Sequence, residues 1–524
     1  MTGETKDNLF VAVRAAPTPL CPTRWPGADH EAETTLLRTL KDNREKWHVY
    51  FNDKRFHNHA THHVLAIYAL GAPGPLIQAA YDSNAAYQRP AFKSPDPITV
   101  NNFVDHLGDD TYYNAYLEFF TDVLLDKGIS ATLDEFILSP RYNYRPEIEE
   151  QEKQPRMLSR FLSGLLHPFI HTGYGVEFDL INQTAEGLAQ AAIHGAQCDP
   201  AAPQSRFSAA SNGLVSNGVS RLTSALPSLL LNGNGSVNGK TAQTLGESAF
   251  TIISRLLADP VTHLDAGGPI EVEGKTPQEL EHITIPLIMK AFTQAGDTVR
   301  KAADEWLPVE GPEPSEDILN HKMEEMIWAN VAFYAICGWK KDEPFNADFF
   351  MMHLVTSALF LPSFLAPSVL PMKSRRLLLN AYFSVSLLAW IGRGTPGLAV
   401  RDFFSGTDKH MVPPGPKFEP HAEALPRNDP KLQNTANVWL PILQATLIHP
   451  DEHLCKIQRA LAHFAAIYGQ RPKGYWKEPG TDNLGCIEEL DGTIFARAAG
   501  LTAQRLGWMT TGEETGKWDF KGFF

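Results

Sequence analysis

Histidines gather in two short stretches of this sequence, and imidazole nitrogen is a common ligand of divalent transition metals. HNHATHH, residues 57–63, carries four histidines in seven positions, and HPFIH, residues 167–171, carries two. His59 and His63 are four residues apart, as are the two histidines of the second stretch. On a helix this spacing puts two side chains on one face, with Cβ atoms about 5 to 6 Å apart. Either stretch could therefore offer two imidazoles to one metal ion.

Two further histidines stand at the edges of apolar segments, His353 in DFFMMHLVTSALFLP and His453 in DEHLCKIQRAL. A buried imidazole needs a partner, which can be a metal ion or simply a backbone carbonyl or carboxylate. No H-E-x-x-H or other compact metal signature is present. The residues alone therefore leave open whether these histidines are ligands or structural groups of the core.

Motifs for the common organic cofactors find no support. GRGTPG, residues 392–397, matches G-x-G-x-x-G, but Pro396 would lie in the first helical turn and no βαβ pattern surrounds it. There is also no G-x-x-x-x-G-K-[ST] and no G-x-S-x-G. A standard dinucleotide, ATP or α/β-hydrolase enzyme is not expected.

Helices must position these groups, because apolar residues recur at three- and four-residue steps, for example in 317–339 and 456–469. Strand-like alternation is scarce, which predicts an all-α protein with one large, bundle-like helical domain over residues 1–524. Residues 199–240 are rich in Ser, Asn, Gly and Pro and predict a flexible insertion. Residues 396–430 are rich in Pro and Gly and predict a loop or lid.

Charge and composition narrow the possible partners and the compartment. The net charge of −14 argues against a nucleic-acid partner. Five scattered cysteines without C-x-x-C spacing suggest neither a disulfide framework nor a thiolate zinc site. The start of the chain lacks a secretory pattern, and the apolar stretch 350–372 contains three prolines. We expect a cytoplasmic protein without a membrane span.

Five ordered blocks of the chain, FHNHATHHVLAIYALGA, YDSNAAYQRP, GLLHPFIHTGYGVEF, HLVTSALF and DEHLCKIQRAL, resemble the fungal questin oxidase-like family. The resemblance extends over most of the sequence. It implies an oxidoreductase, an oxygenase that opens a ring of an anthraquinone-type polyketide in secondary metabolism, by chemistry described as Baeyer-Villiger oxidation. The small aromatic polyketide is then the expected partner.

That chemistry conventionally uses a flavin, for which this sequence has no binding fold. We therefore expect Fe(II) as cofactor and O₂ as co-substrate. Four of the five family-like blocks each imply one histidine ligand: His59, His167, His353 and His453. Three neighbouring histidines are expected to move a proton or to orient a ligand or substrate: His62, His63 and His171.

Four neutral imidazoles would leave both charges of Fe(II) uncompensated in an apolar pocket, so an anionic ligand is attractive. The family resemblance also suggests a lysine at Lys373, in LPMKSRRLLLNAYF. A lysine buried beside a cation has a lowered amine pKa, and its neutral amine can add CO₂ to form a carbamate. The alternative is a solvated lysine near a helix start. The acids Glu177, Asp451 and Glu452 are alternative anions or ordinary surface and capping groups.

Aromatic side chains near the histidine blocks are expected to line the substrate pocket: Tyr68, Phe169, Tyr174 and Phe350. A dioxygenase would need no nicotinamide. Two other functions stay open, an NADPH-dependent Baeyer-Villiger-type monooxygenase and a non-catalytic helical protein that carries hydrophobic polyketides.

Overall fold

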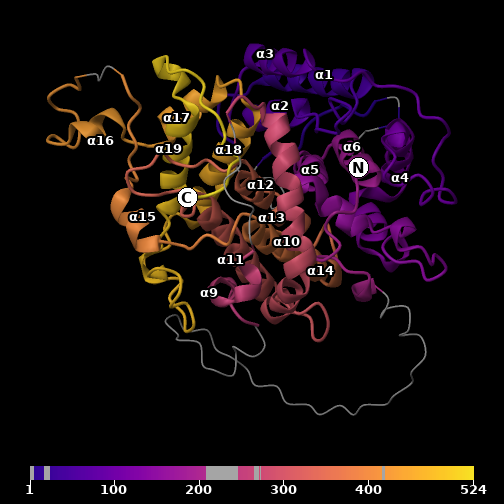
Figure 1. Cartoon of the computed structure of the whole chain (residues 1–524). Coiled ribbons are helices and arrows are strands. Elements are labelled where there is room, and N and C mark those ends of the chain that lie inside the picture. The colour runs from indigo at the N-terminus through magenta and orange to yellow at the C-terminus, as the bar shows by residue number, and fades with distance from the viewer. Residues whose placement is uncertain are drawn as a thin grey trace, which may run out of the picture.

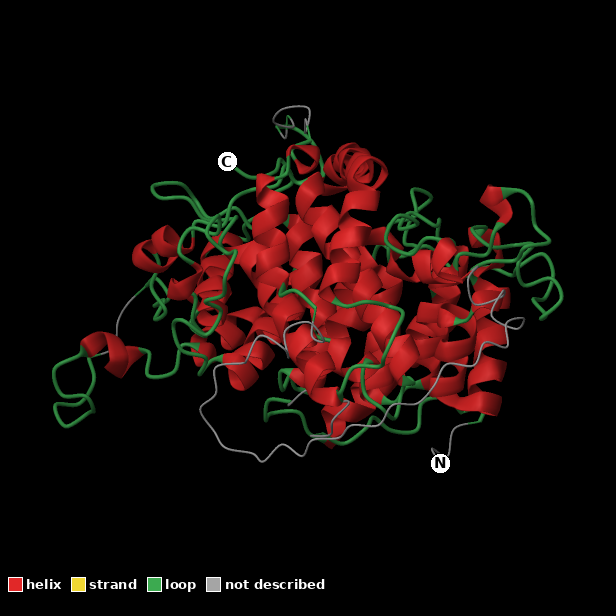
Figure 2. Cartoon of the chain, turned by 90° about the horizontal axis from the view of Figure 1, so that it is seen from below, coloured by secondary structure: helices red, strands yellow, loops and turns green. Residues whose placement is uncertain are grey.

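The computed structural model describes residues 5–6, 8–16, 24–207, 246–264, 271, 273–415 and 419–524. These residues form helices and loops with no named strand, which confirms the predicted all-α class (Figure 2). Residues 208–240 of the predicted insertion lie outside the described residues, as do 416–418 of the predicted Pro/Gly-rich loop.

In the N-terminal half the α-helices are α1 (His30–Lys46), α2 (Ala60–Ala69), α3 (Gly74–Ala85), α4 (Tyr113–Leu133), α5 (Met157–Phe178), α6 (Ile181–Ile193) and α9 (Ala249–Ala258). The C-terminal half adds α10 (Pro277–Trp306), α11 (Glu316–Ala335), α12 (Phe349–Ala358), α13 (Leu361–Phe364), α14 (Met372–Gly392), α15 (Val400–Gly406), α16 (Pro430–Asn434), α17 (Trp439–Leu447), α18 (Glu452–Tyr468) and α19 (Ile494–Leu506). Short 3₁₀ or π turns are η1 (Asp110–Tyr112), η2 (Asp134–Leu138), η3 (Pro140–Tyr142), η4 (Gln151–Lys153), η5 (Pro260–Thr262), η6 (Ile487–Glu489) and η7 (Met509–Thr511).

Helices from distant parts of the sequence meet in the middle of the molecule. In Figure 1 the α1–α6 segment lies on one side, α17–α19 lie on the other, and α11–α14 lie between them. Helix α18 packs on α2 and on α12, and α12 also packs on α5. Since each of these four helices carries one or more of the predicted site histidines, this packing brings them together.

Side-chain caps fix where two of these central helices begin. Asp348 precedes α12, and its carboxylate accepts hydrogen bonds from the backbone N–H groups of Phe350 and Met351. Asp451 precedes α18 and does the same for His453 and Leu454. Such caps satisfy N–H groups that the helix leaves unpaired, and the negative charge suits the positive end of the helix dipole.

Helices α5 and α6 form a buried pair that supports the centre. Every residue of α6 is buried. A Cβ atom on Gly175 would lie 2.3 Å from the Thr184 hydroxyl oxygen, and one on Gly187 would lie 2.2 Å from the Thr172 hydroxyl oxygen. Only glycine allows the two backbones to approach this closely, so these positions set the crossing of the pair.

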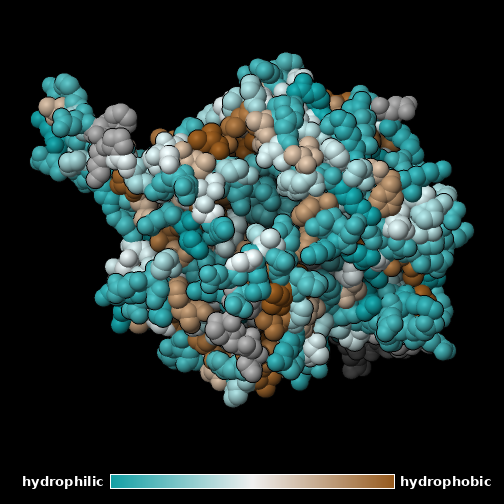
Figure 3. Space-filling model, turned by 45° about the horizontal axis from the view of Figure 1, so that its top comes forward, coloured by the Kyte–Doolittle hydropathy of each residue, from teal (hydrophilic) through white to brown (hydrophobic). Residues whose placement is uncertain are grey.

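The apolar stretch 350–372 does not form one long helix. It contributes α12 and the short α13, which are separated by a turn before Pro362. Within the described ranges, no helix is long and apolar enough to cross a bilayer. The face in Figure 3 is mostly hydrophilic and carries separate hydrophobic patches.

Candidate metal centre

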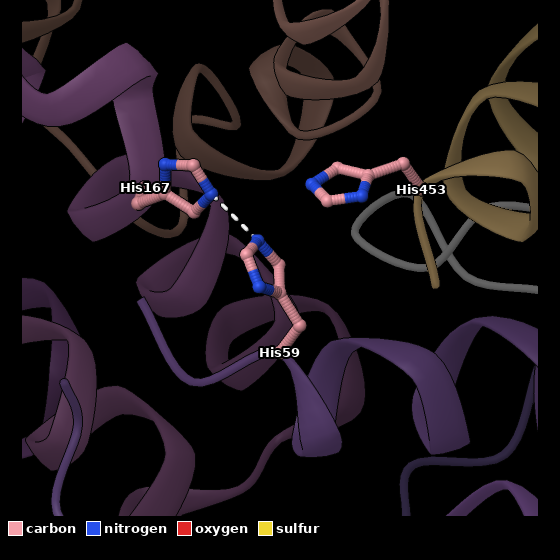
Figure 4. A group of neighbouring side chains, drawn as sticks. All are labelled: His59, His167 and His453. Atoms are coloured by element: carbon pink, nitrogen blue, oxygen red, sulfur yellow. Dashed lines mark hydrogen bonds between the residues drawn. The ribbon is translucent and has the colours of Figure 1, made fainter. Parts of the chain in front are cut away.

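The four histidines predicted as ligands lie together in the core. Nitrogen atoms of His59, His167 and His453 fall within 4.8 Å of one another, and Figure 4 shows the three rings around a common space. The ring of His353 has its centroid 4.9 Å from that of His167 and 5.3 Å from that of His453. All four side chains are buried, with at most 7% exposure.

The free nitrogens of this cluster fit a metal ion. Nε2 of His59 lies 2.8 Å from Nε2 of His167. Two nitrogens bound about 2.1 Å from one ion at a right angle would be about 3 Å apart, so the spacing suits a shared ion as well as a hydrogen bond. Nε2 of His353 and Nε2 of His453 are buried and have no hydrogen-bond partner among the described residues. Buried nitrogens without partners are costly, and a cation would satisfy them.

Backbone carbonyls fix the orientation of the His167 and His353 rings through their Nδ1 atoms. Nδ1 of His167 donates to the carbonyl of Gly164 at 2.6 Å, and Nδ1 of His353 donates to the carbonyl of Phe349 at 2.7 Å. A proton on Nδ1 leaves the lone pair on Nε2, which is the usual arrangement of metal-bound histidine.

Glu452 supports the other two rings. Its Oε1 lies 3.3 Å from Nδ1 of His453 and 3.8 Å from Nδ1 of His59. Burial raises the pKa of this carboxyl to about 7. Glu452 thus lies behind the rings rather than among their Nε2 atoms. The other acids considered from the sequence also have different roles, since Asp451 caps α18 and Glu177 pairs with Arg459.

A break in α5 aims the His167 ring. Ser163 is extended, and Gly164, Leu165 and Leu166 adopt left-handed φ angles of 56°, 53° and 64°. Leucine rarely adopts this conformation, and strained backbone of this kind gathers at functional sites. The break turns the Gly164 carbonyl toward the His167 ring. Helical geometry then resumes, with Pro168 close to the restart, where a missing N–H costs little.

Burial keeps these imidazoles neutral. Desolvation is the largest cause that holds the pKa values of His59, His167 and His453 well below the ordinary value, and it lowers the pKa of His353 to about 3. Neutral imidazole is the form that binds a metal, so the cluster is prepared for a cation near neutral pH.

Two of the histidines predicted to handle protons form a chain with a buried carboxylate. Nε2 of His62 lies 3.1 Å from Nδ1 of His171, and Nε2 of His171 lies 3.0 Å from Glu186, which also accepts from Asn182 at 2.8 Å. Because a carboxylate can only accept, His171 donates to it and His62 donates to His171. Nδ1 of His62 then keeps a lone pair, and this buried atom has no hydrogen-bond partner in the described part of the chain.

His63 has a different neighbourhood. Its Nδ1 accepts a hydrogen bond of 3.0 Å from the Asn84 amide on α3, and burial lowers its pKa to about 4. It does not belong to the His62–His171 chain.

The structure corrects the predicted lysine. Lys373 is exposed in the first turn of α14, so the burial on which its predicted role depends is missing. Lys456, which the sequence analysis did not single out, is 1% exposed, and its Nζ has no hydrogen-bond partner among the described residues. It lies one turn after His453 on α18. Desolvation lowers its pKa to about 8, and its charge in turn lowers the pKa of His59 and His453.

Another imidazole stacks against the cluster. The ring of His57 stacks on that of His167, with centroids 3.9 Å apart, and it also stacks on the ring of His194, with centroids 5.5 Å apart. Nε2 of His57 is buried and has no hydrogen-bond partner within the described ranges. Stacking on His57 holds the plane of the His167 ring.

A narrow cavity of about 60 Å³ reaches His353 and has apolar walls from α5, α10 and α14. Of the four aromatic residues predicted for substrate binding, Phe350 lines this cavity. Tyr174 instead stacks beside His62, Phe169 packs against Phe364, and Tyr68 faces Phe178. These three belong to the core in this structure.

Comparisons with known proteins identify relatives of this chain. A family model described as "Questin oxidase-like" matches residues 56–461. The Baeyer-Villiger oxidase ptaJ of Pestalotiopsis fici is 34% identical over 162 residues, which are 30% of this chain and 34% of that protein. The Baeyer-Villiger monooxygenase AacuH of Aspergillus aculeatus is 24% identical over 86% of this chain and 83% of that protein. Questin oxidase of Aspergillus terreus is 32% identical over 31% and 35%, so the matched segments of it and of ptaJ span about a third of each protein.

Proposed function

Since the chain belongs to the questin oxidase-like family, we propose that it is an oxygenase that uses Fe(II) and O₂ to open a ring of a hydroxylated anthraquinone-type polyketide. The names of its relatives support Baeyer-Villiger-type oxidation, and the buried histidine cluster supports the metal. The observation that carries the proposal is the convergence of four buried imidazoles whose Nδ1 atoms have partners or a carboxylate nearby.

His59, His167, His353 and His453 would hold the iron through their Nε2 atoms. Bound there, Fe(II) would supply the redox chemistry that lets O₂ react with an electron-rich ring without a flavin. The Gly164 and Phe349 carbonyls and Glu452 keep the rings oriented while the apolar walls exclude water.

We assign to Lys456 the carbamate role that was predicted for Lys373. The neutral amine of Lys456 would form a bond from Nζ to the carbon of CO₂, and one amine proton would leave to water. The resulting carbamate carries a negative charge, which would offset the charge of the metal in a region where the nearby imidazoles are neutral. This assignment is supported by the burial of Lys456, by the lack of a hydrogen-bond partner for its Nζ among the described residues, and by its place on the same helix as His453.

His62 is the proposed acceptor of the substrate hydroxyl proton. The proton would go to Nδ1, the ring nitrogen that carries the lone pair and has no hydrogen-bond partner in the part of the chain that the structure describes. The positive charge that then develops on His62 is stabilised through His171 by the Glu186 carboxylate. The ring of His62 lies 5.7 Å from that of His59, so the acceptor adjoins the proposed metal ligands.

An oxygen-uptake assay tests the proposal. Full-length protein reconstituted with Fe(II) should consume O₂ with a hydroxylated anthraquinone and without added nicotinamide, and a ring-opened product should appear by mass spectrometry. A His62→Ala variant should lose about 100-fold or more in rate, whereas replacement of the exposed His263 should change little.

Two other outcomes would replace the proposal. The name of AacuH includes "monooxygenase", which favours nicotinamide-dependent chemistry as a second candidate. Strict dependence of uptake on NADPH would establish that candidate. Absence of uptake and of metal, with polyketide binding intact after His353→Ala, would instead indicate a carrier.

A further inference from the structure

The cavity beside His353 contains very few polar side chains. Leu162 and Leu166 of α5, Phe292 of α10 and Val385 of α14 are among its apolar walls. The side chains on its lining that can form a hydrogen bond through N, O or thiol S are Gln197, Cys198 and His353. In an apolar pocket, a few such groups decide how a ligand is oriented and which ligand fits.

Two of these three groups already have partners. The Cys198 thiol donates to the carbonyl of Leu162 at 3.3 Å, and burial raises its pKa to about 12, so it stays a neutral thiol. His353 donates through Nδ1 to the Phe349 carbonyl, and its Nε2 belongs to the proposed metal centre. Gln197 is the remaining group.

One hydrogen bond fixes the orientation of the Gln197 amide. The backbone N–H of Gly164 lies 3.2 Å from its Oε1, and the backbone N–H of Gln197 is held by the Ser163 hydroxyl at 2.9 Å. A backbone N–H can only donate, so the side-chain atom that faces it must be the oxygen. Nε2 therefore points away from Gly164. No hydrogen bond from this nitrogen is formed with any described residue.

We propose that Nε2 of Gln197 donates a hydrogen bond to a carbonyl or phenolate oxygen of the aromatic ligand in this cavity and thereby selects oxygenated rings over bare hydrocarbons. An amide nitrogen only donates, so it can form a hydrogen bond with an acceptor oxygen of the ligand but not with a C–H group. The inference rests on the proposed function to the extent that the cavity is the place where the substrate binds. The cavity has room for only a few waters, so a three-ring ligand must displace flexible wall side chains such as Met289.

Gln197 also supports the metal centre, which affects the choice of variants. The Gly164 peptide accepts from His167 through its carbonyl and donates to Gln197 through its N–H. Gln197→Met removes both the donor and this support. Gln197→Glu keeps an oxygen for the Gly164 N–H but replaces the donor nitrogen. Gln78→Met removes an amide from the exposed side of α3 and is the matched control.

The test is equilibrium binding of fluorenone and fluorene to the full-length, iron-loaded protein without O₂. These flat three-ring molecules differ by one carbonyl oxygen. The natural chain and Gln78→Met should bind fluorenone about ten-fold more tightly than fluorene, and both Gln197 variants should reduce this ratio to about two or less. Iron content, measured in parallel, should remain unchanged in Gln197→Glu.

The failures can be told apart. A ratio that is the same in the natural chain and both Gln197 variants overturns the role of Gln197 and leaves the proposed oxygenase intact. If neither ring system binds the natural chain, the cavity is not the ligand site, and the inference falls together with that part of the proposed function. An oxygen-uptake assay on the same preparation then shows whether the catalytic proposal survives.

Discussion

Two buried lysines of this protein have opposite surroundings. Lys322 on α11 donates to the Glu247 carbonyl at 2.6 Å and lies 3.3 Å from the Glu325 carboxylate, which also accepts from Trp306. Lys456 on α18 is equally buried and has no hydrogen-bond partner among the described residues. A buried charge with partners holds a fold together, whereas a buried group without one indicates a missing ligand or a chemical role.

Histidines in the two regions differ in the same way. His321, beside Glu325, has a raised pKa because the carboxylate accepts its hydrogen bond. In the cluster, burial instead lowers the pKa of each proposed ligand, and neighbouring positive groups lower it further. The surroundings of Glu325 favour charged side chains, whereas the histidine cluster favours neutral imidazoles.

The largest expected effect of this difference is acid sensitivity. His48, His63 and His194 are buried, and their pKa values fall from 6.5 to about 4. Between these values the unfolded chain binds more protons than the folded one, so stability falls as pH drops from about 6.5 toward 4. Each of the three can contribute up to about 3 kcal/mol.

His321 has the opposite sign, because its stabilisation is complete below its unfolded pKa and is lost as pH rises through its raised folded pKa. The midpoint of urea unfolding should therefore drop as pH falls from about 6.5 toward 4, with and without His321. Above pH 6.5 the natural chain should gain stability from His321 as pH falls, and His321→Gln should lose that gain. A midpoint of urea unfolding that does not change between about pH 6.5 and 4 would contradict the expected acid sensitivity.

Replacement of each lysine by methionine should affect the stability of the protein differently in the two regions, and this is the next largest expected effect. Lys322→Met leaves the buried Glu325 carboxylate without its lysine partner and should lower the free energy of unfolding by about 3 kcal/mol. Lys456→Met removes an unpartnered amine, so stability should be unchanged or higher, while iron affinity should fall. Denaturant titration and metal analysis of both variants give the result. Equal destabilisation by the two substitutions would contradict the proposed difference between Lys322 and Lys456.

A smaller effect is expected at the carboxylate behind the proton acceptor. Glu186→Gln replaces an obligate acceptor with a group that can donate to His171, which disturbs the tautomers of both imidazoles. We expect kcat to fall about 100-fold, with iron content and KM little changed. Glu118→Gln, an exposed acid on α4, serves as control. Loss of iron in Glu186→Gln would show that this chain supports the metal rather than the proton transfer.

Local patterns in the sequence were enough for the helices, because three- and four-residue periodicity marks a helix without reference to the rest of the chain. The four clustered histidines came from the family resemblance, since four of the five family-like blocks each contain one of them. The left-handed turn at 164–166 has no such signal, because two of its residues are leucines. Packing against His194 leaves no space for a side chain on Gly164, and this contact with a residue thirty positions away is not visible in the local sequence.

The lysine illustrates why burial cannot be read from neighbours alone. Lys373 and Lys456 both stand beside apolar helical sequence, yet one lies in an exposed first turn and the other faces the packed centre. Glu186 was missed for a related reason, since its contact with His171 arises from the crossing of α5 and α6. Aromatic residues such as Phe169 were assigned to the pocket because composition does not distinguish core from lining.

Metal analysis of the protein after anaerobic reconstitution tests whether the four buried imidazoles hold one iron ion. We expect about one iron per chain, with nitrogen-rich coordination by X-ray absorption. We also expect loss of that iron in His167→Ala and its retention in His263→Ala. A chain that takes up no stoichiometric iron, or equal iron in both variants, would contradict the proposed iron site.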